Sequence, residues 1–259
     1  MRAMNTKTLV RLVVGIIVAA IGAWQFQSNP GNPEPKHSGQ GKSVQQGPQS
    51  KGGNRPSEGG SPKHGGSSAQ NNQTGDFDYY LVSLSWSPAY CVSHPNDQRQ
   101  CGGRGFGFVL HGLWPQKSAG GYPEDCPATS QPSQAVIQKT LAFMPSEKLI
   151  HHEWKKHGTC TGLSADEYLA LADRAFAAVR LPKDFQAPDA SRNLSVEQII
   201  GEFIAANPGL NKDSLSLRCS GKELEEVRVC VDTQLKPMSC GKGVRTQCGR
   251  DTVQVRAVR

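Results

Sequence analysis

The sequence predicts an α+β fold for one folded module, residues 76–259. Three observations support this prediction. A run rich in aromatic and β-branched residues opens the module, segments with helical periodicity occupy its middle, and strand-like runs close it. Strands followed by helices and then by strands differ from the repeated strand–helix alternation of a parallel sheet. The module is also long enough to bury a hydrophobic core of its own.

The first 75 residues have a different composition. Residues 28–75 lack aromatic residues and consist largely of Gly, Ser, Pro, Gln, Asn and Lys, so they predict a disordered linker. Before them, Arg2, Lys7 and Arg11 precede the apolar run of residues 12–24, an order typical of exported chains. This run is shorter than the roughly 20 residues of a bilayer span. Residues 1–27 are therefore expected to be either a signal peptide or an N-terminal membrane anchor, and the sequence leaves both open.

The net charge of +7 is concentrated outside the predicted module. Of the 29 basic and 22 acidic residues, the first 75 positions hold eight and two, which leaves 21 and 20 for residues 76–259. The bulk charge of the module therefore gives no indication of nucleic-acid binding. Any recognition of phosphate must come from a local cluster of side chains.

The strand at the start of the module is expected at Phe77–Ser87, which contains no glycine and is followed by Pro88. A loop runs from there to Gly103. Phe106–Leu110 predicts a second strand, which His111 ends, and residues 116–129 form a polar loop.

Helices and further strands follow in order. Residues 133–144 and 164–180 predict helices, and Ser164 with Glu167 forms a capping box at the start of the second. Residues 195–206 predict another helix with a similar box. Strands are expected at 214–219, 222–231 and 252–258.

Eight cysteines all lie within the module: Cys91, Cys101, Cys126, Cys160, Cys219, Cys230, Cys240 and Cys248. An even number in an exported chain predicts disulfides formed in an oxidising compartment. A metal site is not favoured because no C-x-x-C pair occurs. The spacing alone does not choose among the possible pairings.

The segment 149–160, LIHHEWKKHGTC, predicts a helix that ends near Gly158. At about 100° per residue, His152, Lys156, Glu153 and His157 lie on one side, at about 0°, 40°, 100° and 140°. This cluster predicts an anion-binding site, whereas His151 lies on the far side. Zinc is disfavoured because the H-E-x-x-x-H spacing separates the two histidines by about 140° instead of the about 40° of H-E-x-x-H. A purely structural role for the four groups is the other alternative.

His111 is the second candidate. A lone histidine at a strand end is usually structural, but together with the helical cluster it completes a set that phosphoryl transfer requires: a base, an acid and a cation. Imidazoles can fill both proton-transfer roles near neutral pH. No serine or cysteine nucleophile pattern accompanies them.

Residues 108–115, FVLHGLWP, and 152–160, HEWKKHGTC, resemble the two active-site segments of the T2 family of secreted ribonucleases. Residues 85–91 and 121–126 resemble its bacterial members, and the likeness extends over 76–259. The resemblance implies a central, mainly antiparallel sheet flanked by helices and stapled by disulfides. It also implies metal-independent, cofactor-free cleavage of single-stranded RNA to 2′,3′-cyclic phosphates and then 3′-phosphates. DNA, which lacks the 2′-hydroxyl, would not be cleaved.

The resemblance also assigns roles to single residues. It implies His111 and His157 as the acid–base pair, with His157 as the expected base and the reverse order as the alternative. His152, Glu153 and Lys156 then match positions that bind phosphate and stabilise the transition state.

The residues that would recognise the base of the RNA are not assigned by the resemblance alone. Trp114 and Tyr122 are candidate stacking surfaces, with packing roles as the alternative. Gln116 stands where many eukaryotic members carry Asn or an acidic residue linked to base recognition, so we expect low base specificity.

The implied disulfide pairs are Cys91–Cys101, Cys126–Cys160, Cys219–Cys248 and Cys230–Cys240. We expect a periplasmic or secreted monomer, with anchoring to the membrane through residues 12–24 as the alternative to a cleaved leader. The competing functions are a non-catalytic RNA-binding protein on the same fold and, less favoured, a metal-dependent hydrolase.

Overall fold

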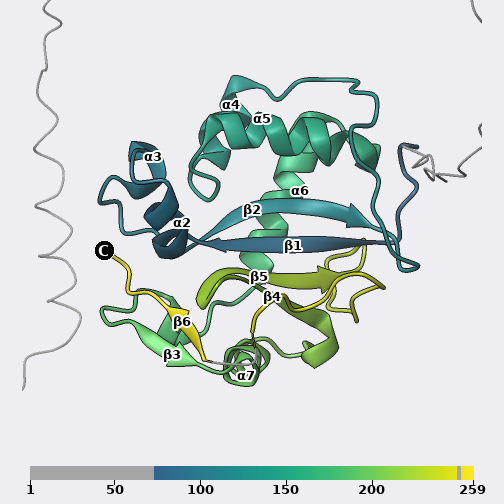
Figure 1. Ribbon diagram of the computed structural model, residues 1–259. Coiled ribbons are helices and arrows are strands. Elements are labelled where there is room, and N and C mark those ends of the chain that lie inside the picture. The colour runs from purple at the N-terminus through teal and green to yellow at the C-terminus, as the bar shows by residue number, and fades with distance from the viewer. Residues whose placement is uncertain (1–72, 250–251) are drawn as a thin grey trace, which may run out of the picture. The chain divides into compact units, whose positions relative to one another are not determined.

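The sheet at the centre of the computed structural model is built around β1 (Tyr79–Trp86), which pairs antiparallel with β2 (Phe108–Gln116) and with β5 (Glu223–Val231) (Figure 1). The structure describes residues 73–249 and 252–259, which lie within one compact unit. β4 (Leu215–Ser220) pairs antiparallel with β5, and β3 (Arg192–Leu194) with β6 (Val253–Val255). Only β6 joins β5 in parallel among the described strands. The expected α+β fold with a mainly antiparallel sheet is confirmed.

Six α-helices are described: α2 (Ser87–Ser93), α3 (Gln98–Cys101), α4 (Gln134–Thr140), α5 (Glu147–Lys156), α6 (Ala165–Ala178) and α7 (Val196–Ala206). Short 3₁₀ helices lie at Gly158–Thr161, Lys183–Phe185 and Lys212–Ser214. α6 begins with the expected capping box of Ser164 and Glu167. α7 begins with a second box, formed by Ser195 and Gln198. Both boxes satisfy first-turn amides and explain why these helices start where they do.

The two faces of β1 bury different sets of side chains, because successive residues of a strand point to opposite sides. Tyr80, Val82, Leu84 and Trp86 belong to the main core, together with apolar residues of α4, α5, α6 and α7. Tyr79 and Leu81 point to the other face, where they pack with Cys230 and Trp114. Ser83 and Ser85 continue this second face towards the end of the strand.

Several elements differ from the sequence prediction. β2 does not end before His111 but continues to Gln116. α2 and α3 occupy the predicted loop after β1, because Pro88 stands in the first turn of α2, where its missing N–H costs nothing. The short strand β3 was not predicted.

The four disulfides link the pairs that the resemblance implied: Cys91–Cys101, Cys126–Cys160, Cys219–Cys248 and Cys230–Cys240. Cys126–Cys160 fastens the loop after β2 to the segment that follows α5. Beside it, the amide of Asp125 donates to the carbonyl of Lys156 at 2.8 Å. The loop and the end of α5 are therefore held together at two neighbouring points.

The predicted signal peptide or anchor, residues 1–27, lies outside the described residues, as does most of the predicted linker 28–75. At the end of that linker, the amide of Gly75 donates to the carbonyl of Cys160 at 2.8 Å. Within the described ranges, no helix has the length and apolarity needed to cross a bilayer.

Candidate active site

His111 is the extra residue of a β-bulge. Gly112 on β2 lies opposite Ser83 on β1, whereas Leu110 lies opposite the next residue, Leu84, so that His111 has no partner in the register. A bulge bends its strand and redirects a side chain. The side chain of His111 is 36% exposed, so this bulge places a half-buried imidazole midway along β2, an edge strand of the described sheet.

Two carboxylates contact the imidazole of His111. Its Nδ1 lies 2.6 Å from Oε1 of Glu226 on β5, and its Nε2 lies 3.9 Å from Oε1 of Glu153 on α5. Burial alone would lower the pKa of His111, but the hydrogen bond and charge of Glu226 and the charge of Glu153 outweigh it, so the pKa is raised above 6.5. The protonated form of His111 is therefore favoured.

Glu153 is held beneath Trp114. Its side chain is 2% exposed, and its Oε2 accepts a hydrogen bond from Nε1 of Trp114 at 2.6 Å. A Cβ atom at Gly112 would overlap both of these atoms, so this contact requires glycine. Burial raises the pKa of Glu153 to about 7, although His111, the Trp114 hydrogen bond and Lys156 oppose the shift. Glu153 can therefore be neutral at mildly acidic pH.

His157 lies at the end of α5, where it is the C-cap with φ of −119° and its amide donates to the carbonyl of Glu153. The observed helix α5 thus ends at Lys156, one residue before His157, whereas the sequence predicted an end near Gly158. His157 still faces the same side as Glu153, because its ring centroid lies 5.3 Å from that of Trp114. The side chain is buried, and its Nδ1 has no hydrogen-bond partner in the part of the chain that the structure describes. Burial and the nearby charges of Lys156, His152 and His111 lower the pKa of His157 to about 3.

Lys156 and His152 complete the predicted cluster on its solvent side. Nζ of Lys156 lies 3.1 Å from Oε2 of Glu124, a carboxylate of the polar loop, and this pairing raises the pKa of Lys156. His152 is exposed. Both groups lie close enough to His157 for their charges to lower its pKa. The structure thus brings together His111, His152, Glu153, Lys156 and His157.

The predicted base-binding residues differ in their placement. The ring of Tyr122 is exposed and its centroid lies 6.1 Å from that of His157. Trp114 lies between the two imidazoles, 5.1 Å from the ring of His111 and 5.3 Å from that of His157. Gln116 is buried and its Nε2 donates to the carbonyl of Pro115, so the structure does not bring its amide into the cluster.

Glu226 and Arg228 belong to the site but were not identified from the sequence. Glu226 is 6% exposed, and its Oε2 accepts from Nε of Arg228 at 2.7 Å. The signal was present: Glu226 and Arg228 carry opposite charges at positions i and i+2, and alternation puts them on one face of β5, whereas Glu223 and Glu225 point to the other. The strand was predicted, but Glu226 and Arg228 were not connected with His111.

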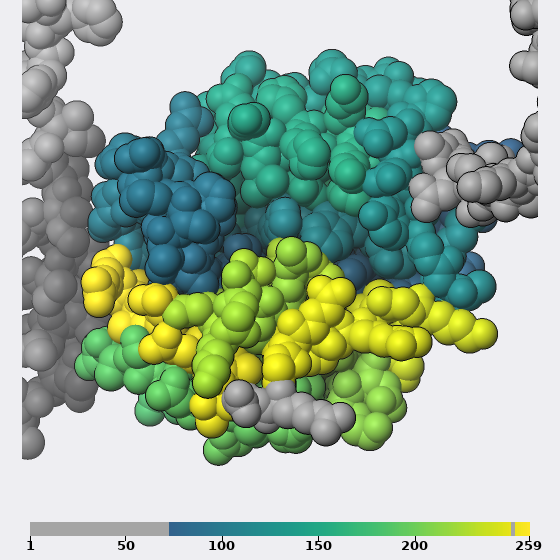
Figure 2. Space-filling view, in the orientation of Figure 1, coloured from purple at the N-terminus to yellow at the C-terminus, as the bar shows by residue number. Residues whose placement is uncertain are grey.

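A pocket of about 370 Å³ adjoins these residues and is lined by His111, Trp114, Glu226 and Arg228, together with α2 and α5 side chains such as His94 and Leu149. Figure 2 shows the surface hollowed between the teal helical layer above and the yellow-green C-terminal strands below. The residues that line the pocket come from these segments. Among the described residues, no group of three or more His, Cys, Asp or Glu is arranged to hold a metal ion.

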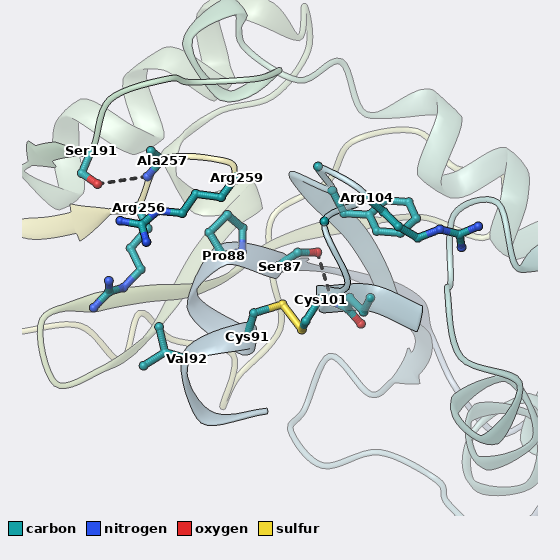
Figure 3. Close-up of a pocket in the computed structure, with 14 residues that line it drawn as sticks. Ser87, Pro88, Cys91, Val92, Cys101, Arg104, Ser191, Arg256, Ala257 and Arg259 are labelled. Carbon is teal, nitrogen blue, oxygen red and sulfur yellow. Dashed lines mark hydrogen bonds between the residues drawn. A yellow bond between two sulfur atoms is a disulfide. The ribbon is translucent and has the colours of Figure 1, made fainter. Parts of the chain in front are cut away.

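A second pocket, of about 340 Å³, is lined by the Cys91–Cys101 disulfide and by none of the residues predicted to be catalytic or to bind a base (Figure 3). Arg104 points away from the other labelled side chains there. Arg256 is already paired with Glu223 through two bonds of 2.5 and 2.7 Å. The chemistry-bearing cluster is therefore at the first pocket.

The chemistry that the cluster of His111, His152, Glu153, Lys156 and His157 can perform follows from the imidazoles of His111 and His157. His111 favours the protonated form and His157 the neutral form, so one can donate a proton while the other accepts one. Glu153 adds a buried carboxyl group 3.9 Å from His111, and Lys156 adds a half-exposed cation that could bind an anion. The arrangement fits acid–base chemistry on a phosphate ester.

Comparison with known proteins agrees with this chemistry. A ribonuclease from Aeromonas hydrophila is 48% identical over 100 residues, covering 39% of this chain and 45% of the relative. A probable ribonuclease from Haemophilus influenzae is 34% identical over 187 residues, covering 65% of this chain and 63% of the relative. The chain thus spans about half to two thirds of the length of these relatives.

The fold also has solved neighbours. The structure of an RNase-related protein from Calystegia sepium matches with a TM-score of 0.55 and 22% identity, over 70% of this chain and 97% of that one. The model of the ribonuclease T2 family matches residues 77–240, a range that includes both segments predicted to form the active site. The chain therefore belongs to the ribonuclease T2 family.

Proposed function

We propose that the chain is a metal-independent endoribonuclease that cleaves single-stranded RNA with low base specificity, first to 2′,3′-cyclic phosphates and then to 3′-phosphates. One observation carries the proposal. Imidazoles from β2 and from the end of α5 lie on either side of Trp114, and their pKa values are shifted in opposite directions. The names of the ribonuclease relatives and the family membership support the substrate class.

In the first step, His157 accepts the proton of the 2′-hydroxyl as its oxygen attacks phosphorus. The bond from phosphorus to the 5′-oxygen breaks, and His111 donates its proton to that oxygen. In the second step, which reverses the first with water in place of the 5′-hydroxyl, the now neutral His111 accepts a proton from water as the water oxygen attacks phosphorus. The bond from phosphorus to the 2′-oxygen breaks, the protonated His157 returns its proton to that oxygen, and a 3′-phosphate is left. This order is supported by the neutral form of His157 and the protonated form of His111 that their surroundings favour.

Binding of substrate should bring the base closer to its working range. In the free protein, burial and the charges of Lys156 and His152 lower the pKa of His157. The negative charge of a bound phosphodiester would offset those two charges and raise this pKa. Lys156, released in part from Glu124, would then stabilise the charge that develops on the non-bridging oxygens. Glu153 in its neutral form can donate a hydrogen bond to the same phosphate without repelling it.

Low base specificity is proposed because the aromatic surface near His157 is the exposed ring of Tyr122, whose face does not distinguish one base from another. Tyr122 can stack on any base. Trp114 is occupied by Glu153 and by the guanidinium of Arg228, which lies 5.3 Å from its ring. We therefore assign Tyr122 as the stacking surface and Trp114 as the wall between the two histidines.

Export of the chain is part of the proposal, with residues 1–27 as a signal peptide or anchor, 28–75 as a linker and 76–259 as the catalytic domain, acting as a monomer in the periplasm or outside the cell. Four disulfides support it, because such bonds persist in oxidising compartments. The mass of the mature N-terminus from a native host tests whether the leader is cleaved, and sedimentation tests the monomer.

The test of activity uses poly(A), poly(U), poly(C), poly(G) and a DNA oligonucleotide with EDTA present. We expect cleavage of the RNA polymers with cyclic-phosphate ends and no cleavage of DNA. His111→Ala and His157→Ala should each lower turnover by roughly 10²- to 10⁴-fold. His151→Ala, on the same helix but directed towards Glu147, is the matched control and should retain activity. Loss of activity on chelation with recovery on adding zinc, or binding of RNA without cleavage, would overturn the proposal.

A further inference from the structure

Glu226 reaches His111 across an intervening strand. In the sheet, β1 separates β2 from β5, so the backbones of these two strands lie roughly 10 Å apart at about 4.8 Å per strand. Ser85 of β1 lies opposite Glu226 in the register, and Ser83 lies opposite Arg228. Serines are short enough to leave room above β1. The side chains of His111 and Glu226 therefore meet over them at 2.6 Å.

Each oxygen of the Glu226 carboxylate has its own partner. Oε1 contacts Nδ1 of His111, whereas Oε2 accepts a hydrogen bond from Nε of Arg228 at 2.7 Å and lies 2.6 Å from Nη2 of the same guanidinium. The guanidinium of Arg228 lies over the ring of Trp114. The carboxylate is thus fixed in place and held in its ionised form, because His111 and Arg228 outweigh burial and lower the pKa of Glu226 to about 2.

The two nitrogens of His111 are consequently in different situations. Nδ1 is committed to a short hydrogen bond, whereas Nε2 lies 3.9 Å from the nearest carboxylate oxygen, beyond hydrogen-bond distance. The bond at Nδ1 fixes the plane of the ring. It leaves Nε2 as the nitrogen available to a ligand.

We propose that Glu226, held by Arg228, is a positioning residue that orients His111 with Nε2 towards the leaving oxygen and keeps the proton on the ring until that oxygen departs. The inference rests on the proposed ribonuclease function and adds to it a residue that acts through His111, without touching the substrate. It accounts for a buried ion pair that the packing of the sheet does not require, since burying charges usually costs stability.

Other charges also face His111. Glu226 and Arg228 come from β5 and Glu153 from α5, and His157, whose pKa His111 lowers, lies beyond Trp114. Arg218 of β4, Glu225 of β5 and His94 of α2 line the same pocket. Glu226 alone among these described groups makes a hydrogen bond to the imidazole of His111. Its replacement should therefore change the titration of His111 directly.

The first measurement follows the histidine rings of the full chain by ¹⁵N NMR as a function of pH. In Glu226→Gln, which preserves size but removes the charge, the pKa of His111 should fall relative to wild type. Glu223→Gln is the matched control, because it removes another carboxylate of β5 that pairs with Arg256 and not with His111. An unchanged pKa of His111 in a folded Glu226→Gln variant would overturn the proposal. If that variant does not fold, Arg228→Lys loosens the same carboxylate and should move this pKa in the same direction.

The second measurement compares two substrates that differ in the need for an acid. One is a ribodinucleotide, whose 5′-oxygen must be protonated, and the other is a uridine 3′-phosphate ester with a 4-nitrophenolate leaving group, which needs no proton. Glu226→Gln should lower kcat on the dinucleotide by roughly 10- to 100-fold, as for other groups that orient an imidazole through its second nitrogen. It should remain close to wild type on the nitrophenyl ester.

The outcomes separate the two proposals. Equal losses on both substrates would show a merely structural role for Glu226 and overturn the inference. A wild-type chain that cleaves neither substrate would instead refute the ribonuclease function, while the NMR titration would still decide whether Glu226 controls the protonation of His111.

Discussion

Substituting Gly112 by alanine places a methyl group where Trp114 and Glu153 meet. The new Cβ would overlap Oε2 of Glu153 and Nε1 of Trp114 and would lie 2.9 Å from Cδ of Glu153. The 2.6 Å hydrogen bond between these side chains cannot persist in that geometry. The backbone of Gly112 is not among those with positive φ, so the cost arises from space and from the lost bond.

The magnitude can be worked from these contacts. Losing a hydrogen bond to a charged group costs about 1.5–3 kcal/mol, and forcing a methyl group into a packed site costs about 1–3 kcal/mol. The smaller entropy of the unfolded alanine chain returns about 0.4–1 kcal/mol. We therefore expect Gly112→Ala to lower the free energy of unfolding by about 2–5 kcal/mol and to lower ribonuclease activity, because Glu153 is displaced.

Urea unfolding of the oxidised protein at pH 8 measures this loss, since Glu153, with a pKa of about 7, is then largely ionised. Gly201→Ala is the matched control. It lies exposed on α7 with no atom within 4 Å of the new Cβ, and it should stabilise the protein by about 1 kcal/mol. A Gly112→Ala variant that unfolds and cleaves like wild type would refute this account of the site.

Three further outcomes are expected. Lys156→Ala should lower kcat more than it raises KM, because the ammonium acts on the transition state. Substitution of the exposed neighbour, Lys155→Ala, is the control. An effect confined to KM would show that Lys156 only binds the substrate. In the folded protein the pKa of Glu226 is about 2, below its ordinary 4.5, so the stability that its carboxylate contributes is complete above pH 4.5 and is lost as the pH falls towards 2. Over that range the free energy of unfolding of the wild type should fall by about 3 kcal/mol more than that of Glu226→Gln, as measured by unfolding at a series of acid pH values. Replacing Cys126 and Cys160 together by alanine, which opens a closed loop of 34 residues, should cost about 4 kcal/mol in calorimetry, and an unchanged melting temperature would contradict it.

Local sequence patterns were sufficient for much of the fold. The capping boxes at Ser164 and Ser195 located α6 and α7, because a capping box is formed by residues only three apart. The run of strand-forming residues located β1, and Pro88 marked its end. Features that depend on pairing were harder to predict. The bulge at His111 requires knowledge of the partner strand, so periodicity alone ended β2 too early.

The candidate site shows the same division. His152, Glu153, Lys156 and His157 are close in the sequence, and their cluster could be predicted from helical geometry and family resemblance. Glu226 lies 115 residues from His111 and meets it across a strand, a relation that no local pattern contains. The pKa values of the two histidines likewise depend on burial and on neighbours from several elements.

The Cys126–Cys160 disulfide has a consequence for when the chain can act. One imidazole comes from the sheet and the other from the end of a helix, and this bond fastens the loop carrying Glu124 to the segment just after His157. In a newly made chain whose cysteines are still reduced, this covalent link would be absent, and the two histidines would not be held at their distance from each other. Oxidation would then serve as the activating event. If the chain is exported as proposed, it would acquire the proposed ribonuclease activity only in the oxidising compartment, and its synthesis beside the cell's own messenger RNA would need no dedicated inhibitor.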